Sequence, residues 1–375
     1  MMTVAWVNIA LLTVAGSAWM MPSVQRPTLP FGVRVPAQRA GDTAIAGQIR
    51  TFRGRVAASG LVGLLAGVAL TLAVAGNGGD DDSVALVGLA PMVALMLLVA
   101  LFYLRARRAI QRVKAEDGWY TGVTQRITVD TSLRTGPERL PWPWMLPALL
   151  VPLVTLVAGI AAYPDMPDRV PTRTNGSTVV AWQAKSPWVV GVPVAIELAT
   201  TVLLIALLAW SYRSRADLEP SAPKRSASQH RLFLRRISRA LLVLATCGNL
   251  AILCAVLPMW QGRAPGPLAT VAMLLSALLG TVYVIVVAVR AGQGGSRIAT
   301  VPAPPAERPD AAHPDDDRHW RVAGLCYVNR DDPAILVQKR IGVGWTLNFG
   351  NPWSLLLLAA VLAALLAGVL VPALV

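Results

Sequence analysis

The chain has few charged residues and few cysteines. Charged residues make up 14% of its 375 residues, against about 25% in a typical soluble domain. This shortage excludes an ordinary cytosolic enzyme and a disordered regulator. The three cysteines, Cys247, Cys254 and Cys326, form no CxxC pair and no cluster with histidine, so neither a disulfide framework nor a zinc site is indicated. Nucleophile-elbow, Walker, HExxH and paired-carboxylate motifs are also missing, so we expect no enzymatic activity and no cofactor.

The chain is rich in long apolar runs. Hydrophobic residues make up 55% of the chain, and they gather in runs of about 20 residues, enough to cross a hydrocarbon core about 30 Å thick. Uninterrupted runs favour helices over a membrane β-barrel, whose strands alternate. The sequence therefore predicts an all-α integral membrane protein with eight transmembrane helices. Their ranges are 3–21, 56–75, 83–104, 145–162, 188–210, 240–260, 267–289 and 353–375.

Basic residues indicate how these helices are oriented. The chain has 34 Lys and Arg against 20 acidic residues, a net charge of +14. Almost all of the 34 lie in alternate connections, which are 22–55, 105–144, 211–239 and 290–352. The positive-inside rule places such segments in the cytoplasm. Both termini are then extracytoplasmic, and the excess charge reflects membrane orientation and not nucleic-acid binding.

The same segments divide the chain into five predicted regions. These are a three-helix region with cytoplasmic loops (1–144), a two-helix unit with an extracytoplasmic Pro/Asp loop (145–211), a second two-helix unit (212–290), a flexible cytoplasmic linker (291–318) and a hairpin motif with the last helix (319–375). In the last region, β-prone runs at 325–328 and 335–337 flank an Asx- and Pro-rich turn, which predicts a small cytoplasmic β-hairpin. We expect it to pair with a strand over 121–131 or to rest on helix ends. His230, His313 and His319 are expected to be exposed.

One acidic residue and two asparagines inside predicted spans are candidates for a polar site. Glu197 is close to the middle of its span, where a charge is costly and usually faces a bundle interior or a cavity. Asn249 and Asn8 are candidate hydrogen-bond partners. Two interpretations stay open, a proton or cation site and a neutral glutamic acid that is hydrogen-bonded between helices.

The loop after the fourth span carries both signs of charge on a proline-stiffened frame. Its candidate binding residues are Asp165, Asp168, Arg169, Pro171, Thr172, Arg173 and Asn175. This composition suits recognition of a peptide, a lipid head group or another envelope component. A plain structural cap over the helix ends is the alternative.

Two of the motifs resemble one known group. The loop reads YPDMPDRVPTRTNG and resembles the YPxLPDxIPTHxN loop of an uncharacterised domain in SdpI-like immunity proteins of bacteria. The usual histidine of that loop is Arg173 here, so a role that rests on it does not transfer. In the first connection, FGVRVP resembles the FGxRTP signature of the same group through Gly32, Arg34 and Pro36.

A third motif precedes the last span. Residues 319–350 resemble an uncharacterised domain of actinobacterial membrane proteins, with the pattern YxNPDDPxxFVxKRxGxGWTLNFG before a last helix. Its candidate residues are Asp331, Asp332, Pro333, Lys339, Arg340, Trp345 and Asn348. Lysine and arginine gain from the anionic inner leaflet, and aspartate can cap neighbouring backbone amides. We therefore predict an element that lies against the membrane and fixes the last helix, with docking of a partner as the second possibility.

The resemblance also implies a function. SdpI-like relatives protect cells from a secreted toxic peptide and signal to a repressor. We accordingly expect a non-enzymatic immunity or sensing protein in a bacterial plasma membrane. Its expected partners are the lipid bilayer, an extracytoplasmic peptide or envelope ligand and a cytoplasmic regulator. The alternative is a small-solute or ion-coupled transporter that uses Glu197.

Overall fold

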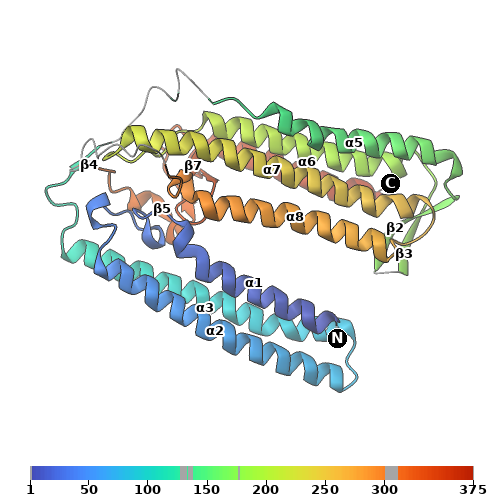
Figure 1. Ribbon diagram of the computed structural model, residues 1–375, viewed down its shortest axis with the longest axis horizontal. Coiled ribbons are helices and arrows are strands. Elements are labelled where there is room, and N and C mark those ends of the chain that lie inside the picture. Colours follow the sequence, from blue (N-terminus) through green and yellow to red (C-terminus); the bar gives the residue numbers. More distant parts are fainter. Residues whose placement is uncertain (1, 127–132, 134–137, 176–177, 300–310, 375) are drawn as a thin grey trace.

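The computed structural model describes residues 2–126, 133, 138–175, 178–299 and 311–374. Long helices dominate it and form two groups that approach each other at one end (Figure 1). The first group contains α1 (Met2–Val24), α2 (Thr43–Gly76) and α3 (Asp81–Glu116). The second contains α5 (Trp142–Ala162), α6 (Trp188–Arg213), α7 (Pro223–Trp260) and α8 (Pro267–Ala291), and α9 (Pro352–Leu374) ends the chain.

The helices indicate a multi-pass membrane protein. Within the described residues, six are long and apolar enough to cross a membrane: α2, α3, α5, α6, α7 and α8. The apolar parts searched in α1 and α9 are shorter, Asn8–Val24 and Pro352–Ala363. Of the eight predicted spans, six therefore meet this criterion and two do not. Large apolar side chains such as Leu61, Leu97 and Leu278 are exposed on these helices, as expected of surfaces that face lipid.

Three of the helices extend well beyond their apolar runs. α2, α3 and α7 have 34, 36 and 38 residues. In α7 the helix begins at Pro223, which is favoured at the first helical position. Phe233, Leu234 and Ile237 then bury one helix face. The sequence analysis interpreted the beginning of this segment as a connection, because its lysine, arginine and serine residues hid the apolar face.

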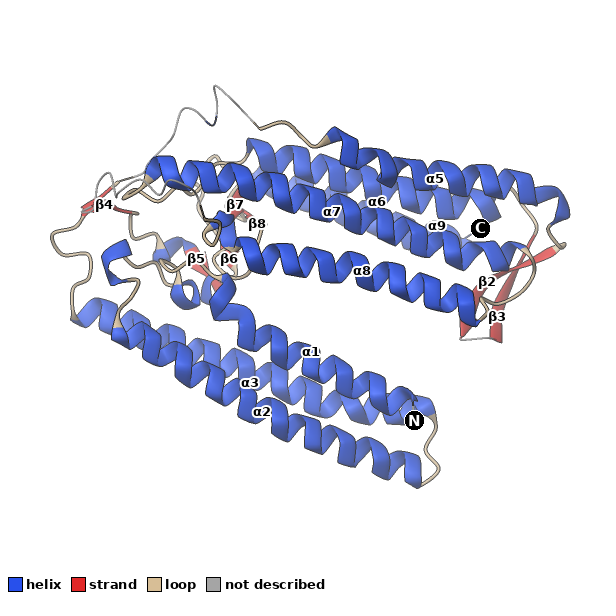
Figure 2. Cartoon of the chain, viewed as in Figure 1, coloured by secondary structure: helices blue, strands red, loops and turns tan. Residues whose placement is uncertain are grey.

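Small sheets lie at the two ends of the helices (Figure 2). At one end, β2 (Arg169–Asn175) and β3 (Thr178–Ala184) form an antiparallel hairpin. At the other end, β1 (Thr124–Gln125) pairs in parallel with β4 (Ala311–Ala312), β5 (Trp320–Arg321) pairs with β6 (Cys326–Tyr327), and β7 (Leu336–Gln338) pairs with β8 (Trp345–Leu347). These ends are called the hairpin end and the junction end below.

The predicted hairpin between 325–328 and 335–337 is wrong in its pairing. β6 takes β5 as its partner and β7 takes β8, while a bridge between Tyr327 and Asn348 connects the two small sheets. The physical reason is the turn after β7, where Gly342 and Gly344 have φ values of 76° and 111°. Glycine adopts such values without steric cost, so the chain reverses there. The strand predicted over 121–131 is described up to Arg126, and β1 within it pairs with β4.

Short 3-10 helices occupy the connections. They are η1 (Pro30–Gly32), η2 (Ala37–Arg39), η3 (Tyr163–Asp165), η4 (Gln293–Gly295), η5 (Asp317–His319) and η6 (Val322–Gly324). η1 belongs to a buried cluster in which Phe31 and Val33 pack against Phe52 of α2 and Ile110 of α3. The connection between α1 and α2 is thereby folded onto its own helix group, with its polar groups directed toward the rest of the junction end.

Candidate functional site

Three segments that are distant in the sequence meet at the junction end. They are the α1–α2 connection, the α6–α7 connection and the chain from Ala311 to Asn351 (Figure 1). Their charged side chains form one network with Lys114 of α3, which we call the charged junction. It consists of Arg26, Arg34, Lys114, Asp217, His313, Asp316, Asp317 and Arg340.

Arg340 is the most deeply buried charge of this network. Its side chain is 1% exposed. The guanidinium donates hydrogen bonds to the carboxylates of Asp316 and Asp317 and to the carbonyl oxygen of Gly32, at 2.8 Å for the last. It also lies 4.9 Å from the centre of the Trp320 ring. A planar, always charged guanidinium suits this combination of fork-like hydrogen bonds and ring stacking, which a lysine would not reproduce.

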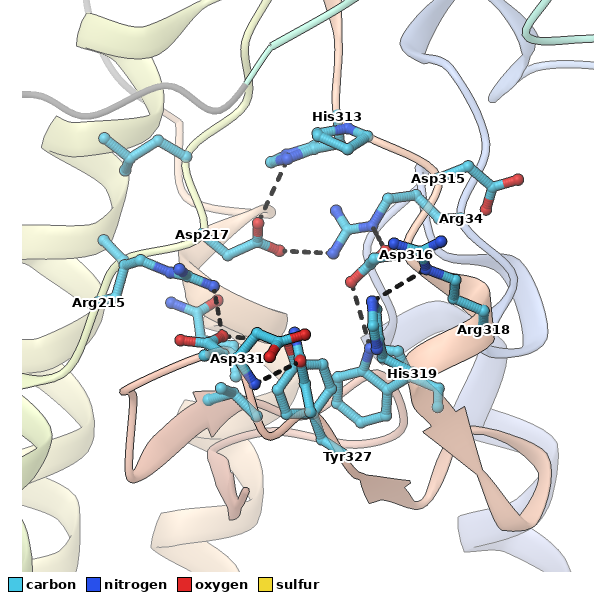
Figure 3. Close-up of a pocket in the computed structure, with 18 of the residues that line it drawn as sticks. Arg34, Arg215, Asp217, His313, Asp315, Asp316, Arg318, His319, Tyr327 and Asp331 are labelled. Atoms are coloured by element: carbon cyan, nitrogen blue, oxygen red, sulfur yellow. Dashed lines mark hydrogen bonds and ion pairs between the residues drawn. The ribbon is translucent and has the colours of Figure 1, made fainter. Parts of the chain in front are cut away.

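Arg34 binds the same carboxylate from the opposite side. Its Nε lies 2.8 Å from Oδ1 of Asp316, and its Nη2 lies 3.3 Å from Oδ2 of Asp217. Its backbone N–H donates to Asp317. Figure 3 shows Arg34 between Asp217 and Asp316 at the edge of a cavity. The motif of the first connection and the motif before α9 are therefore held by shared aspartates.

Asp217 joins the α6–α7 connection to this network. Its Oδ2 accepts a hydrogen bond from Arg26 at 3.0 Å, and its Oδ1 lies 3.4 Å from Nδ1 of His313. Lys114, at the end of α3, lies 2.8 Å from Asp315 and 2.8 Å from Asp317. The first helix group thus contributes cations to aspartates that lie outside the helices, and one of these aspartates, Asp217, belongs to the connection between two helices of the second group.

The α1–α2 connection is held in a strained turn. Phe31 has a φ of 47° and Gly32 a φ of 69°, and positive values are uncommon for residues other than glycine. The Phe31 carbonyl accepts hydrogen bonds from Tyr103 at 2.7 Å and from Arg107 at 3.1 Å. Tyr103 also donates to the carbonyl of Ala323, whose own φ is 57°. Two strained turns are therefore cross-linked by one tyrosine of α3.

The charges of the junction perturb one another. Burial raises the pKa of Asp217, but Arg34, His313 and Arg26 outweigh it and hold that pKa well below its usual range. Burial also raises the pKa values of Asp316 and Asp317. Nearby arginines outweigh this effect, so both pKa values are lowered. For His313, burial lowers the pKa to about 4 despite the attraction of Asp217. At neutral pH the aspartates are ionised and the histidine is neutral.

A cavity of about 370 Å³ lies beside the charged junction. Residues from all three segments line it, among them Arg34, Asp217, His313 and Asp332 (Figure 3). Nη1 of Arg34 is buried and has no hydrogen-bond partner among the described residues. The carboxylates around the cavity outnumber its arginines, so the lining favours no small anion.

The motif before α9 forms the floor of this region. Asp332 is buried, and its carboxylate accepts hydrogen bonds from Tyr327 at 3.0 Å and from Arg215 at 3.1 Å. Asn348 is fully buried and donates to the carbonyls of Asn329 and Asp332. The Asx-rich turn is thereby closed on itself and tied to the end of α6.

Other predicted residues of this motif have different surroundings. Asp331, Pro333 and Lys339 are exposed. Trp345 packs against Phe233 of α7, with ring centres 5.8 Å apart. Of the first-connection motif, Gly32, Arg34 and Pro36 are all buried. The structure thus brings Arg34, Gly32 and Arg340 together.

The predicted loop residues lie at the hairpin end, away from the charged junction (Figure 1). Met166 and Val170 anchor the hairpin to Val190 and Trp260. Pro171 is buried. Asn175 is the last residue of β2, and only its backbone is among the described parts of the structure. The remaining candidates are exposed, and they are Asp165, Asp168, Arg169, Thr172 and Arg173.

The polar residues of the predicted spans do not form one site. Glu197 is completely buried, and its Oε1 accepts a hydrogen bond from Thr155 at 3.2 Å. Asn249 donates instead to Thr201 at 3.0 Å and to the carbonyl of Ala148. Asn8 is buried in α1, next to Gly67 of α2, so it belongs to the other helix group.

Sequence reasoning missed the acidic half of the charged junction. His313, Asp316 and Asp317 fall in the segment that was predicted to be a flexible linker, yet residues 311–319 pack into the junction, and 300–310 lie outside the described residues. The expectation that His230 and His313 are exposed is wrong, because their side chains are buried or nearly so. The sequence signal that could have revealed these residues was the HPDDD run, because several adjacent carboxylates need cations nearby if they are buried.

Comparison with known proteins identifies a short part of the chain. Residues 330–355 match a family of unknown function, DUF5808. This stretch contains Asp332, Arg340 and Asn348 and runs into the first turn of α9. No curated protein and no solved structure matches the chain.

Proposed function

We propose that the chain is an eight-pass protein of a bacterial plasma membrane that senses or neutralises an agent acting on the cell envelope, without catalysing a reaction. The long apolar helices, the basic segments at the junction end and the resemblance of the loop before β3 to SdpI-like proteins support this proposal. The junction end is cytoplasmic in this arrangement, and the hairpin end is extracytoplasmic.

The observation that carries the proposal is the binding of Arg34 and Arg340 to one carboxylate, that of Asp316. Because Arg26 and Arg34 of the first group's connection bind Asp217 of the α6–α7 connection, and Arg34 shares Asp316 with Arg340, the groups cannot shift relative to each other without exchanging charge-assisted hydrogen bonds. Such bonds have discrete partners, so they favour two defined arrangements over a continuous range. An element of this kind is what a sensor requires to convert a distant contact into a response.

A single helix connects the hairpin to this element. α6 begins at Trp188, shortly after β3, and ends at Arg213, shortly before Asp217. Its 26 residues span about 39 Å at 1.5 Å per residue. A ligand that moves the hairpin therefore acts on the α6–α7 connection through a rigid rod. A cytoplasmic regulator would read the result at the exposed residues of the motif before α9, Asp331, Pro333 and Lys339.

The test is a deletion strain that is challenged with membrane-active peptides. We expect greater sensitivity than in the parent strain and restoration by the wild-type gene. The variants Asp168→Ala and Arg169→Ala change exposed hairpin residues, so they should lose protection at normal abundance. The control Arg330→Ala is exposed at the junction end and should protect fully. Unchanged sensitivity of the deletion strain to every peptide would refute the sensing and immunity proposal.

One observation favours transport as a second candidate. Glu197 is completely buried, and its Oε2 has no hydrogen-bond partner among the described residues. A carboxyl oxygen in that position is suited to binding a proton or a cation that enters the helix group. If the protein is an ion-coupled transporter, Glu197→Gln should abolish ion-dependent uptake by proteoliposomes and leave the melting temperature nearly unchanged. The matched control Thr200→Val lies on the same helix, where Thr200 is exposed and bonds to its own backbone.

A further inference from the structure

The outer face of the β2–β3 hairpin exposes large apolar side chains. Along β3 the exposed residues alternate with half-buried ones. Val180 is 51% exposed and Trp182 is 50% exposed, and both lie on the same face of the strand. The opposite face of the hairpin is anchored to the helices through Val170 and Trp260. The hairpin therefore holds this apolar face outward in a fixed position. Contact with a lipid layer or with another molecule would remove the face from water.

The ends of the helices beside the hairpin also expose large apolar side chains. Trp188, in the first turn of α6, is 57% exposed, and Leu268, in the first turn of α8, is 85% exposed. Figure 2 shows that the hairpin runs across the ends of the helices and not away from them. The α7–α8 turn supports it, since Gly262 lies against Pro167 just before β2. Val180 and Trp182 thus add to the apolar surface at this end of the helices.

The charges on the neighbouring strand fit the surface of a bilayer. Arg169 is exposed and pairs in register with Ala184, which lies on the same face of β3 as Val180 and Trp182. Tryptophan is enriched at head-group depth because its ring is apolar and its N–H is polar. Arginine can extend its guanidinium to lipid phosphates while its stem covers apolar surface. This combination of side chains on one face is suited to a layer that is apolar below and anionic above.

We propose that the outer face of the hairpin docks on the phospholipid head-group layer of the membrane that the helices cross. Trp182 and Val180 enter the boundary between head groups and acyl chains, and Arg169 binds lipid phosphate. The hairpin is then a membrane-surface element and not a loop in free solution. This inference stands on the exposed face and its position, and it does not depend on the proposed function.

The experiment measures the depth of a single fluorescent label. In a background with Cys247, Cys254 and Cys326 changed to alanine, Val180→Cys carries a nitrobenzoxadiazole dye. The protein is placed in nanodiscs of phosphatidylethanolamine and phosphatidylglycerol, with or without a lipid whose head group bears a nitroxide. We expect the nitroxide to quench this label at least twofold and aqueous iodide to quench it weakly. The matched control is Val179→Cys, the half-buried neighbour on the other face, which should respond less to the nitroxide.

A second measurement separates docking from folding. Trp182→Ser and Arg169→Gln leave the anchoring residues Val170 and Trp260 unchanged, so the helices should melt normally in detergent. In nanodiscs, the double variant should lose part of the increase in melting temperature that phosphatidylglycerol gives the unaltered protein. If the label at position 180 is open to iodide and insensitive to the nitroxide, the face lies in water and is left for a protein partner, and the inference fails.

Discussion

Arg34 and Arg340 come from opposite ends of the chain, yet both donate a hydrogen bond to Oδ1 of Asp316. Both arginine side chains are more than nine-tenths buried. Removing one partner of a buried ion pair leaves a charge without compensation, which is far more costly than never having buried the pair. Asp316 therefore determines whether the α1–α2 connection and the motif before α9 can pack together.

The first prediction follows from this shared carboxylate. Asp316→Asn keeps the shape of the side chain but removes the negative charge between the two guanidinium groups. Breaking a fully buried pair costs about 3–5 kcal/mol. Because the Asp316 side chain is 29% exposed, we expect a smaller loss of about 2 kcal/mol in the free energy of unfolding. Thermal melting of the protein in nanodiscs measures it. The control is Asp315→Asn, which removes a more exposed carboxylate whose ion pair, among the described residues, is with Lys114; an equal effect of both variants would contradict the shared-carboxylate argument.

The second prediction separates two adjacent aspartates. Asp332 is buried, where it binds Tyr327 and Arg215 and also caps the backbone N–H of Ala334. Asp331 is exposed. Asp332→Ala should therefore lower the free energy of unfolding by about 2 kcal/mol, since a buried hydroxyl loses its acceptor. Asp331→Ala should change it by about 0.5 kcal/mol or less. Melting curves of the two single variants measure the difference. A larger effect of Asp331→Ala would mean that contacts other than those of Asp332 hold the turn.

The helices could be predicted from the sequence because burial in lipid imposes one strong pattern. α5, α6 and α8 begin or end within a few residues of the apolar runs at 145–162, 188–210 and 267–289. A backbone in hydrocarbon must bond to itself, so a long apolar run leaves little choice of structure. α7 was underestimated because its first half depends on burial against neighbouring segments and not against lipid.

The charged junction could not be predicted in the same way. Asp316 and Asp317 lie in a short acidic run without periodicity, which by itself resembles a solvated linker. Distant partners, Arg34, Lys114 and Arg340, order them, and pairing over such sequence distances has no local signal. Three strands, β1, β6 and β7, overlap predicted β-prone runs, but their partners were not predicted correctly, because alternation marks a strand and does not say which other strand completes the ladder. Individual residues of the site, Arg34 and Arg340, were found through the motifs that contain them.

The third prediction concerns acid. His313 faces Asp217 and Glu219 from the α6–α7 connection and Arg26 and Arg34 from the first connection. Burial lowers its pKa to about 4, from 6.5 in an exposed histidine. The unfolded chain therefore binds a proton on this histidine more readily than the folded protein does. Stability is fully present above pH 6.5 and is lost as the pH falls toward 4, by an amount on the order of 3 kcal/mol.

Unfolding measured at a series of pH values tests this prediction. His313→Gln should reduce the slope of the curve between pH 6.5 and 4, and the slope that remains there belongs in part to His230, whose pKa burial also lowers to about 4. The lowered pKa values of Asp217, Asp316 and Asp317 act in a lower range, where the folded protein loses stability as these carboxylates become protonated. That part of the curve should persist in the variant, with a smaller lowering of the Asp217 pKa because the attraction of His313 is lost. An unchanged slope between pH 6.5 and 4 would show that His313 is solvated or already protonated.

The fourth prediction concerns orientation. Single cysteines are placed in a background without native cysteines, at Asn77 and Thr172 toward one face and at Arg225 and Arg330 toward the other; all four positions are exposed. The distribution of basic residues places the second pair in the cytoplasm. An impermeant maleimide added to intact cells should label positions 77 and 172, and it should reach 225 and 330 only after permeabilisation. Labelling of position 225 in intact cells would reverse the proposed orientation.

The last prediction concerns the strained turn that supports Arg340. Gly32 has a φ of +69°, and a Cβ added there would lie 2.9 Å from Oη of Tyr103 and 3.0 Å from Nη1 of Arg107. These are the two groups that hold the Phe31 carbonyl. A side chain in the left-handed region costs about 1–2 kcal/mol by itself, and displacement of the two donors adds to it.

Gly32→Ala should therefore lower the free energy of unfolding by about 2 kcal/mol or more and should loosen Arg340, which donates to the Gly32 carbonyl. The matched control is Gly54→Ala in α2, where an added Cβ meets no atom within 4 Å. Because alanine is the better helix former, the control should gain about 0.5–1 kcal/mol. Melting in nanodiscs compares the two, and cleavage by a protease that cuts after arginine reports on the region around Arg340. If Gly32→Ala melts as the wild type does and Arg340 stays protected, the turn does not carry the strain that its backbone angles indicate, and the first connection has room to rearrange around its motif.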